Sequence, residues 1–251
     1  HRALGATVFY RGQFRRSMEH VASVIAATSG TVGDSATLIS DIYDVVDPRV
    51  TCHSYLSWNL WMLGHPDQAR KESQHAIQLA GHLNHPFSLA LALSFATWLE
   101  HFRGSHQGDI DLATQALAHC QHHGFPFWTG WNQVLLGWAT SHDPELSATR
   151  DPVALINEGL ANWKEKGSNL GRGYFLCLLA ETHLRLGNWL PAMDALAQAR
   201  TFAEENDERY WDAERHRLDG ELLLLRGESP EAALKCFRQS LARAREQAAH
   251  A

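Results

Sequence analysis

Small residues recur along this chain at a spacing of about 40 residues, and most are followed by a glycine that can end a helix. The small residues are Gly5, Ser57, Thr97, Gly137, Ala180 and Gly220; the glycines are Gly12, Gly64, Gly104, Gly187 and Gly227. The first step is longer than the others, and a polar, proline-containing stretch replaces the glycine of the fourth unit. Self-similarity at one period is the signature of a repeat array, in which each unit covers the apolar face of its neighbour.

Residues 179–199, LAETHLRLGNWLPAMDALAQA, indicate what one unit contains. Gly187 suits the left-handed cap that ends a first helix. Pro191 suits the first turn of a second helix, where its missing N–H costs nothing. Ala192, Leu196 and Ala199 then recur at i, i+4 and i+7, which places them on one face of that helix. Each unit is therefore predicted to be a pair of helices. Second helices are expected to begin near Phe14, Pro66, Asp109, Pro152, Pro191 and Pro230.

The units resemble tetratricopeptide repeats, although they are longer than the standard length of about 34 residues. We predict an all-α fold, a right-handed α-solenoid of about six helical hairpins forming a single domain over residues 1–251. The units are expected at residues 1–27, 49–84, 86–123, 125–167, 171–206 and 209–249. Residues 28–48 break the register with Gly, Ser and Asp, so an irregular linker is expected there.

Four stretches carry a narrower resemblance. They are SYLSWNLWMLGHPDQA (54–69), HPFSLALAL (85–93), GFPFWTGW (124–131) and RYWDAERHRLDGELLL (209–224). They are similar to the repeat region of large bacterial predicted ATPases, which join class III adenylate or guanylate cyclase or regulatory domains to a STAND-type nucleotide-binding module. The resemblance implies a sensor or interaction module that is a fragment of a longer signalling protein. The chain has no GxxxxGK[ST] phosphate loop, so nucleotide hydrolysis is not expected of it.

Charge and cysteine content argue against several other classes of protein. Lys and Arg number 22 against 28 Asp and Glu, a formal net charge of −6, and no basic run stands out. Nucleic acid is therefore not expected as a partner, because phosphate binding needs a basic stripe. The best apolar stretch, residues 88–99, is too short to cross a bilayer, so no membrane association is expected. The four cysteines are spread without a CxxC pair, which favours reduced thiols and a cytoplasmic location.

The first helices of such an array line its concave face, and the predicted inward positions are rich in aromatic side chains. These positions gather Trp58, Trp61, Trp98, Trp131, Trp138, Tyr174, Arg217 and Glu221. Aromatic walls with few polar groups are typical of ligand pockets, and Trp and Arg are frequent interface anchors. We therefore predict a groove that binds a protein, a peptide or a small molecule. The alternative for any one Trp is packing between adjacent repeats. The alternative for Arg217 and Glu221 is a charge network along one helix with Glu214.

The 16 histidines of the chain raise a second hypothesis, which is catalytic. His101, His142 and His183 fall on or beside the first helices of three neighbouring units, with Glu181 and Glu214 close by. Three imidazoles and a carboxylate could hold a divalent metal and an activated water. The alternative function is thus a metal-assisted hydrolase of esters or phosphoesters. The same residues could equally be scattered polar groups on a wet surface.

A zinc site is a further possibility at His119 and His123, which share a helix face at i and i+4. Histidines at this position could instead close a helix before Gly124, where they suit the negative end of the helix dipole. No other cofactor is predicted. The first unit also leaves an apolar face that solenoids normally cap, so a homodimer through that end is a further expectation.

Overall fold

The computed structural model describes residues 1–28, 46–165 and 169–250, and within these ranges the chain forms 13 helices and no strand. Most of the predicted linker, residues 28–48, lies outside the described residues. The array is all-α and tetratricopeptide-like, as predicted. Among the described residues no helix combines the length and apolar character that crossing a bilayer requires.

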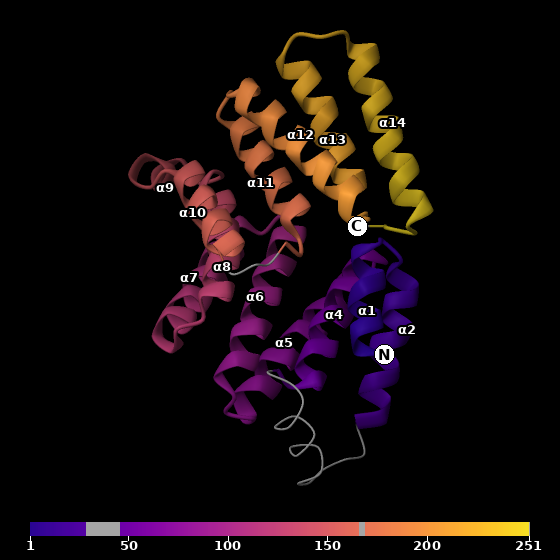
Figure 1. The fold of residues 1–251 in the computed structure, drawn as a ribbon, viewed down its shortest axis with the longest axis vertical. Helices are drawn as coiled ribbons and strands as arrows, with labels where there is room; N and C mark the ends of the chain where they lie inside the picture. The colour runs from indigo at the N-terminus through magenta and orange to yellow at the C-terminus, as the bar shows by residue number, and fades with distance from the viewer. Residues whose placement is uncertain (29–45, 166–168, 251) are drawn as a thin grey trace.

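Twelve of these helices pair into six successive hairpins (Figure 1). The first three hairpins are α1 (Arg2–Tyr10) with α2 (Phe14–Thr28), α4 (Pro48–Met62) with α5 (Pro66–His82), and α6 (Pro86–Phe102) with α7 (His106–His123). The last three are α8 (Pro126–Thr140) with α10 (Pro152–Glu165), α11 (Arg172–Arg185) with α12 (Trp189–Asn206), and α13 (Asp212–Leu225) with α14 (Pro230–Glu246). The polar turn of the fourth hairpin contains a short extra helix, α9 (Pro144–Thr149).

Glycines with left-handed backbone angles make the turns between paired helices, because only glycine adopts this conformation without a Cβ clash. The predicted turn glycines have φ values from 64° at Gly104 to 83° at Gly64. Second helices begin at the predicted residue in four hairpins. The exceptions are α7, which begins at His106 rather than Asp109, and α12, which begins at Trp189 rather than Pro191. In both, the chain enters the helix almost directly after the turn glycine.

The small residues of the repeat mark close approaches between paired helices. A Cβ on Gly137 would lie 2.8 Å from the carbonyl oxygen of Pro152, and one on Gly220 would lie 2.6 Å from the Phe237 ring. At these two positions, in the fourth and sixth hairpins, the contacts leave no room for a side chain, so glycine is needed where the paired helices approach closely.

The two ends of the array meet, and Figure 1 shows the C-terminus beside the N-terminal hairpin. The carbonyl oxygen of Tyr10 accepts hydrogen bonds from the backbone N–H groups of Arg209 (2.7 Å) and Tyr210 (3.1 Å). The N–H of His250 donates to the carbonyl of Met62 at 2.8 Å. Tyr210 also packs against Phe9 and Tyr10, which are buried. Residues that flank the last hairpin therefore contact the ends of α1 and α4, and the homodimer through the first unit stays a prediction.

Candidate functional site

Five of the predicted groove residues lie in the hydrophobic core, and one of them, Trp138, is 3% exposed and also lines a cavity described below. Trp58, Trp98 and Tyr174 are 0% exposed and Trp131 is 2% exposed. Their rings pack on one another: Trp98 stacks on Tyr174 with centroids 4.2 Å apart and contacts Trp131 at 4.4 Å. They do not line an open groove, which corrects the prediction for these four. The reason is that the closed array brings the inner faces of the first helices into mutual contact.

The other inward residues surround a cavity of about 620 Å³ inside the array. The last turns of α4, α6, α8 and α11 reach it, and α13 and α14 close the opposite side. Seven predicted residues line it: Trp61, Trp138, His101, His142, Glu181, Glu214 and Arg217. We call this cavity the concave pocket. Its size is typical of a ligand site.

One wall of the concave pocket consists of imidazole and indole rings. The Trp138 indole contacts His101 at 4.1 Å and His142 at 4.3 Å between ring centroids. His106, from the start of α7, stacks on His142 at 3.9 Å. The Nδ1 atoms of His101 and His106 are buried and have no hydrogen-bond partner among the described residues. Both residues line the concave pocket, so its wall contains imidazoles whose hydrogen-bonding capacity the described residues do not fully use.

Burial keeps these imidazoles uncharged. Removal from water, with His142 and His106 nearby, lowers the pKa of His101 to about 3. Burial likewise lowers the pKa of His142 to about 4, against the opposing effect of its Nδ1 contact with the Trp138 carbonyl at 3.0 Å. The pKa of His106 is lowered too, first by burial and then by Arg185. At neutral pH each ring can accept a hydrogen bond on one nitrogen and donate from the other.

The opposite wall is ionic. The Nε1–H of Trp138 donates to Glu181 at 2.7 Å, which ties the two walls together. Arg217 donates from Nε to both carboxylate oxygens of Glu214 at 2.8 Å, also contacts Glu221, and lies 3.7 Å from Glu181. Burial and the charge of Glu214 raise the pKa of Glu181. Burial acts to lower the pKa of Arg217, but the three carboxylates outweigh it and raise that pKa.

Besides the four core residues, Glu221 and His183 also lie outside the concave pocket. Glu221 lines an adjoining recess of about 480 Å³, which shares Glu181, Arg185 and Arg217 with the pocket. His183 lines neither cavity, and burial lowers its pKa while the charge of Asp151 opposes this shift. The three histidines of the catalytic hypothesis therefore do not converge.

Neither predicted metal site has a ligand set. His119 and His123 are adjacent, with ring centroids 4.6 Å apart, but Nε2 of His119 lies 2.8 Å from the carbonyl oxygen of Pro86. Over residues 1–28, 46–165 and 169–250, no group of three or more His, Cys, Asp or Glu side chains could hold a metal ion. The candidate pair of His119 and His123 therefore has no third ligand among these residues.

Several lining residues were missed by the sequence analysis. They are Phe102, His106, Arg185 and Trp211, together with Leu241, Ala244 and Gln247 on or just after α14. Counting inward positions on first helices could not find α14, which is a second helix. The same count could not find Trp211, because it precedes α13 as its N-cap residue. Trp211 does lie in one of the four quoted stretches, RYWDAERHRLDGELLL, and that stretch could have indicated it.

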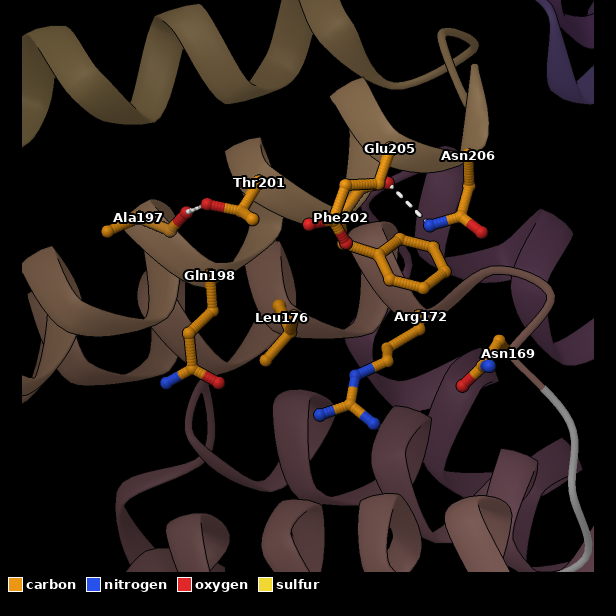
Figure 2. A pocket seen from close by; sticks show the side chains of 9 residues that line it. All are labelled: Asn169, Arg172, Leu176, Ala197, Gln198, Thr201, Phe202, Glu205 and Asn206. Atoms are coloured by element: carbon orange, nitrogen blue, oxygen red, sulfur yellow. Dashed lines mark hydrogen bonds between the residues drawn. The ribbon is translucent and has the colours of Figure 1, made fainter.

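A second cavity, of about 560 Å³, lies on the outside of the fifth hairpin, α11 with α12 (Figure 2). Its residues include Arg172, Gln198 and Glu205, and all but Asn169 come from α11 and α12. The hydrogen bonds drawn there are local to α12: Thr201 donates to the carbonyl of Ala197, and Asn206 donates to that of Phe202. We call it the outer cavity. It gathers no unpartnered buried group of the kind found in the concave pocket.

Comparison with known proteins identifies the fold alone. No family model matches the chain, and no curated protein matches it. Among solved structures, the chain is similar to a Rap protein complexed with competence and sporulation factor, with a TM-score of 0.68 and 16% sequence identity. The similarity covers 97% of this chain and 62% of the Rap chain, so the chain spans less than two thirds of the length of that neighbour.

Proposed function

We propose that this chain is a binding module whose concave pocket takes an extended segment of a peptide or of a partner protein. The observation that carries the proposal is the concave pocket itself, where buried nitrogen atoms without partners lie beside partly exposed aromatic rings. Buried polar groups are nearly always hydrogen-bonded in folded proteins, so unpartnered ones beside a cavity favour a ligand or ordered water there.

The shape of the site favours an extended occupant over a compact one. The concave pocket continues into the adjoining recess, and Glu181, Arg185 and Arg217 line both. An elongated site of this kind suits a chain with side chains spaced along it. The fold neighbour was itself solved in complex with competence and sporulation factor, which supports a binding role for this architecture.

The wider setting of the module is a second part of the proposal. The resemblance of the four quoted stretches to the repeat regions of STAND-type ATPases and cyclase regulators supports a sensor role in a longer signalling protein. The hydrolase alternative is the weaker candidate: His101, His142, Glu181 and Glu214 line the concave pocket, but His183 does not. Among the described residues, no group of three or more His, Cys, Asp or Glu side chains could hold a metal ion.

The test is selection of peptides from a random displayed library on the full chain, followed by titration of the selected peptides. The variant Ala213→Trp places a large side chain in the concave pocket, where Ala213 lies at the wall. We expect it to weaken binding at least tenfold. The matched control is Ala197→Trp, which fills the outer cavity and should leave binding unchanged.

Two results would contradict the proposal. One is that no peptide is enriched on the folded chain. The other is that the two tryptophan variants, both folded by circular dichroism, bind the selected peptides equally well.

A further inference from the structure

We infer that the occupant of the concave pocket presents a basic group, the guanidinium or ammonium of an Arg or Lys side chain, to the carboxylates of Glu181 and Glu214. This inference rests on the proposed function and specifies the chemistry that the site selects. It is supported by the charge balance of the pocket, by its aromatic walls and by the orientation of the surrounding helices.

Carboxylates outnumber cations in the concave pocket and its recess. Three of them, from Glu181, Glu214 and Glu221, surround the single guanidinium of Arg217. Arg185 is the second cation and lies near His106 and His142, whose rings are uncharged at neutral pH. The lining residues from α4 and α14 carry no charge. The pocket and its recess together therefore have three carboxylates against two guanidinium groups, and this excess would attract a further guanidinium or ammonium group.

Aromatic faces supply the other half of a site for a basic side chain. Trp211 stacks on Phe102 with centroids 5.3 Å apart, and both line the concave pocket with Trp61 and Trp138. A guanidinium or ammonium placed over such faces gains cation–π attraction, most of all with Trp. The uncharged imidazoles of His101 and His106 line the same pocket, and each has a nitrogen that can accept a hydrogen bond, depending on the tautomer.

The helix ends around the concave pocket also favour a cation. Its lining includes residues from the last turns of α4, α6, α8 and α11, and C-terminal helix ends carry partial negative charge. Two helices, α7 and α13, present their N-terminal ends instead. Glu214 already lies in the first turn of α13 and offsets its partial positive charge.

The experiment compares charged and neutral probes of the same shape. N-acetyl-arginine amide and its neutral analogue N-acetyl-citrulline amide are titrated against the full chain, and binding is followed by the indole N–H resonances of Trp138 and Trp211. In parallel, three random peptide libraries with a fixed central Arg, Leu or Glu are passed over the immobilised chain. We expect the arginine probe to bind at least tenfold more tightly than the citrulline probe, and the Arg library to be retained preferentially.

Two variants locate the selectivity. Glu214→Gln removes one carboxylate and should reduce the preference for Arg over Leu at least fivefold. The control Glu204→Gln makes the same charge change on an exposed position of α12 and should not alter it. Trp211→Leu keeps an apolar side chain but removes a π face. It should also reduce the preference for Arg over Leu, and it serves as the test if Glu214→Gln fails to fold.

The outcomes separate the inference from the proposed function. Equal retention of the Leu or Glu library, or equal binding of the citrulline probe, overturns the basic-group inference while peptide binding stands. Retention of none of the three libraries overturns peptide binding, and in that case selective binding of the arginine probe would still support the charge chemistry of the concave pocket.

Discussion

Glu208 illustrates at the residue scale how burial competes with favourable hydrogen bonds. Its side chain lies at the start of α11, where Oε2 accepts a hydrogen bond from the Gly171 N–H at 3.1 Å. A carboxylate is normally stabilised at a helix N-terminus. The residue is only 7% exposed, however, and burial raises the pKa of Glu208 from 4.5 to about 7 despite the backbone donors.

This shift predicts a pH dependence with a definite sign. Between pH 4.5 and about 7 the carboxyl is ionised in the unfolded chain but keeps its proton in the folded one. The stability it contributes is therefore fully present below pH 4.5 and is lost as pH rises to about 7. The whole effect is worth about 3 kcal/mol. We expect Glu208→Gln to become more stable relative to the wild type between pH 5 and pH 8, as measured by urea unfolding.

The difference between wild type and variant is the informative quantity. His101 and His142, whose pKa values are lowered, make stability rise with pH over an overlapping range, and this contribution is common to both proteins. If the difference in the free energy of unfolding between Glu208→Gln and the wild type stayed constant from pH 5 to pH 8, the buried carboxyl would not titrate as described.

At the scale of the elements, the crossing of α8 and α10 depends on glycine. A Cβ on Gly137 would lie 2.8 Å from the Pro152 carbonyl oxygen and 3.1 Å from the Ile156 nitrogen. A second close approach in the same pair places a Cβ on Gly130 at 2.8 Å from the carbonyl oxygen of Gly159. Because these neighbours are backbone atoms, a side chain would force the two helices apart.

We therefore expect Gly137→Ala to lower the free energy of unfolding by about 1–3 kcal/mol. The matched control is Gly81→Ala near the end of α5, where an added Cβ has nothing within 4 Å. It should raise stability by about 0.5 kcal/mol, because alanine loses less backbone entropy on folding. Chemical denaturation measures the free energy of unfolding of both variants. Equal changes in the two variants would mean that α8 and α10 can move apart at little cost.

The hairpins could be predicted from the sequence because their signals are local. Gly187, expected as a helix end, has φ of 76°, and Pro66 begins α5 as expected. The site was only partly predictable, because it depends on how far the array closes. Periodicity placed Trp58 and Trp138 on the same inner face. It could not tell that both are buried in the core and that only Trp138 also lines the concave pocket.

At the scale of the whole molecule, the contact between the two ends of the array predicts that the hairpins unfold as one cooperative body. The apolar core runs without interruption from Phe9 in α1 to Leu222 in α13. The second hairpin and the end of the chain both contribute to the concave pocket, since Trp61 and Met62 come from α4 while Gln247 and Ala249 follow α14. In an open solenoid each unit contacts only its neighbours, and the terminal units open first.

Tyr210 is the side chain on which this closure most depends. It is 2% exposed, and its ring lies 5.1 Å from Tyr10, 5.5 Å from Phe9 and 6.2 Å from Trp98. Its hydroxyl is buried without a hydrogen-bond partner in the part of the chain that the structure describes. Removing the ring and removing only the hydroxyl should therefore have opposite consequences.

We expect Tyr210→Ala to cost about 3–5 kcal/mol of stability, the usual range for truncating a large core aromatic. Tyr210→Phe should be neutral or stabilising, since it deletes an unsatisfied buried polar group and keeps the ring. Native-state hydrogen exchange provides the decisive reading, because loss of closure should raise exchange in α1 and α2 as well as in α13. Faster exchange confined to α13 in Tyr210→Ala would show that the first hairpin is held by its own neighbour, α4, and that the array behaves as an open solenoid.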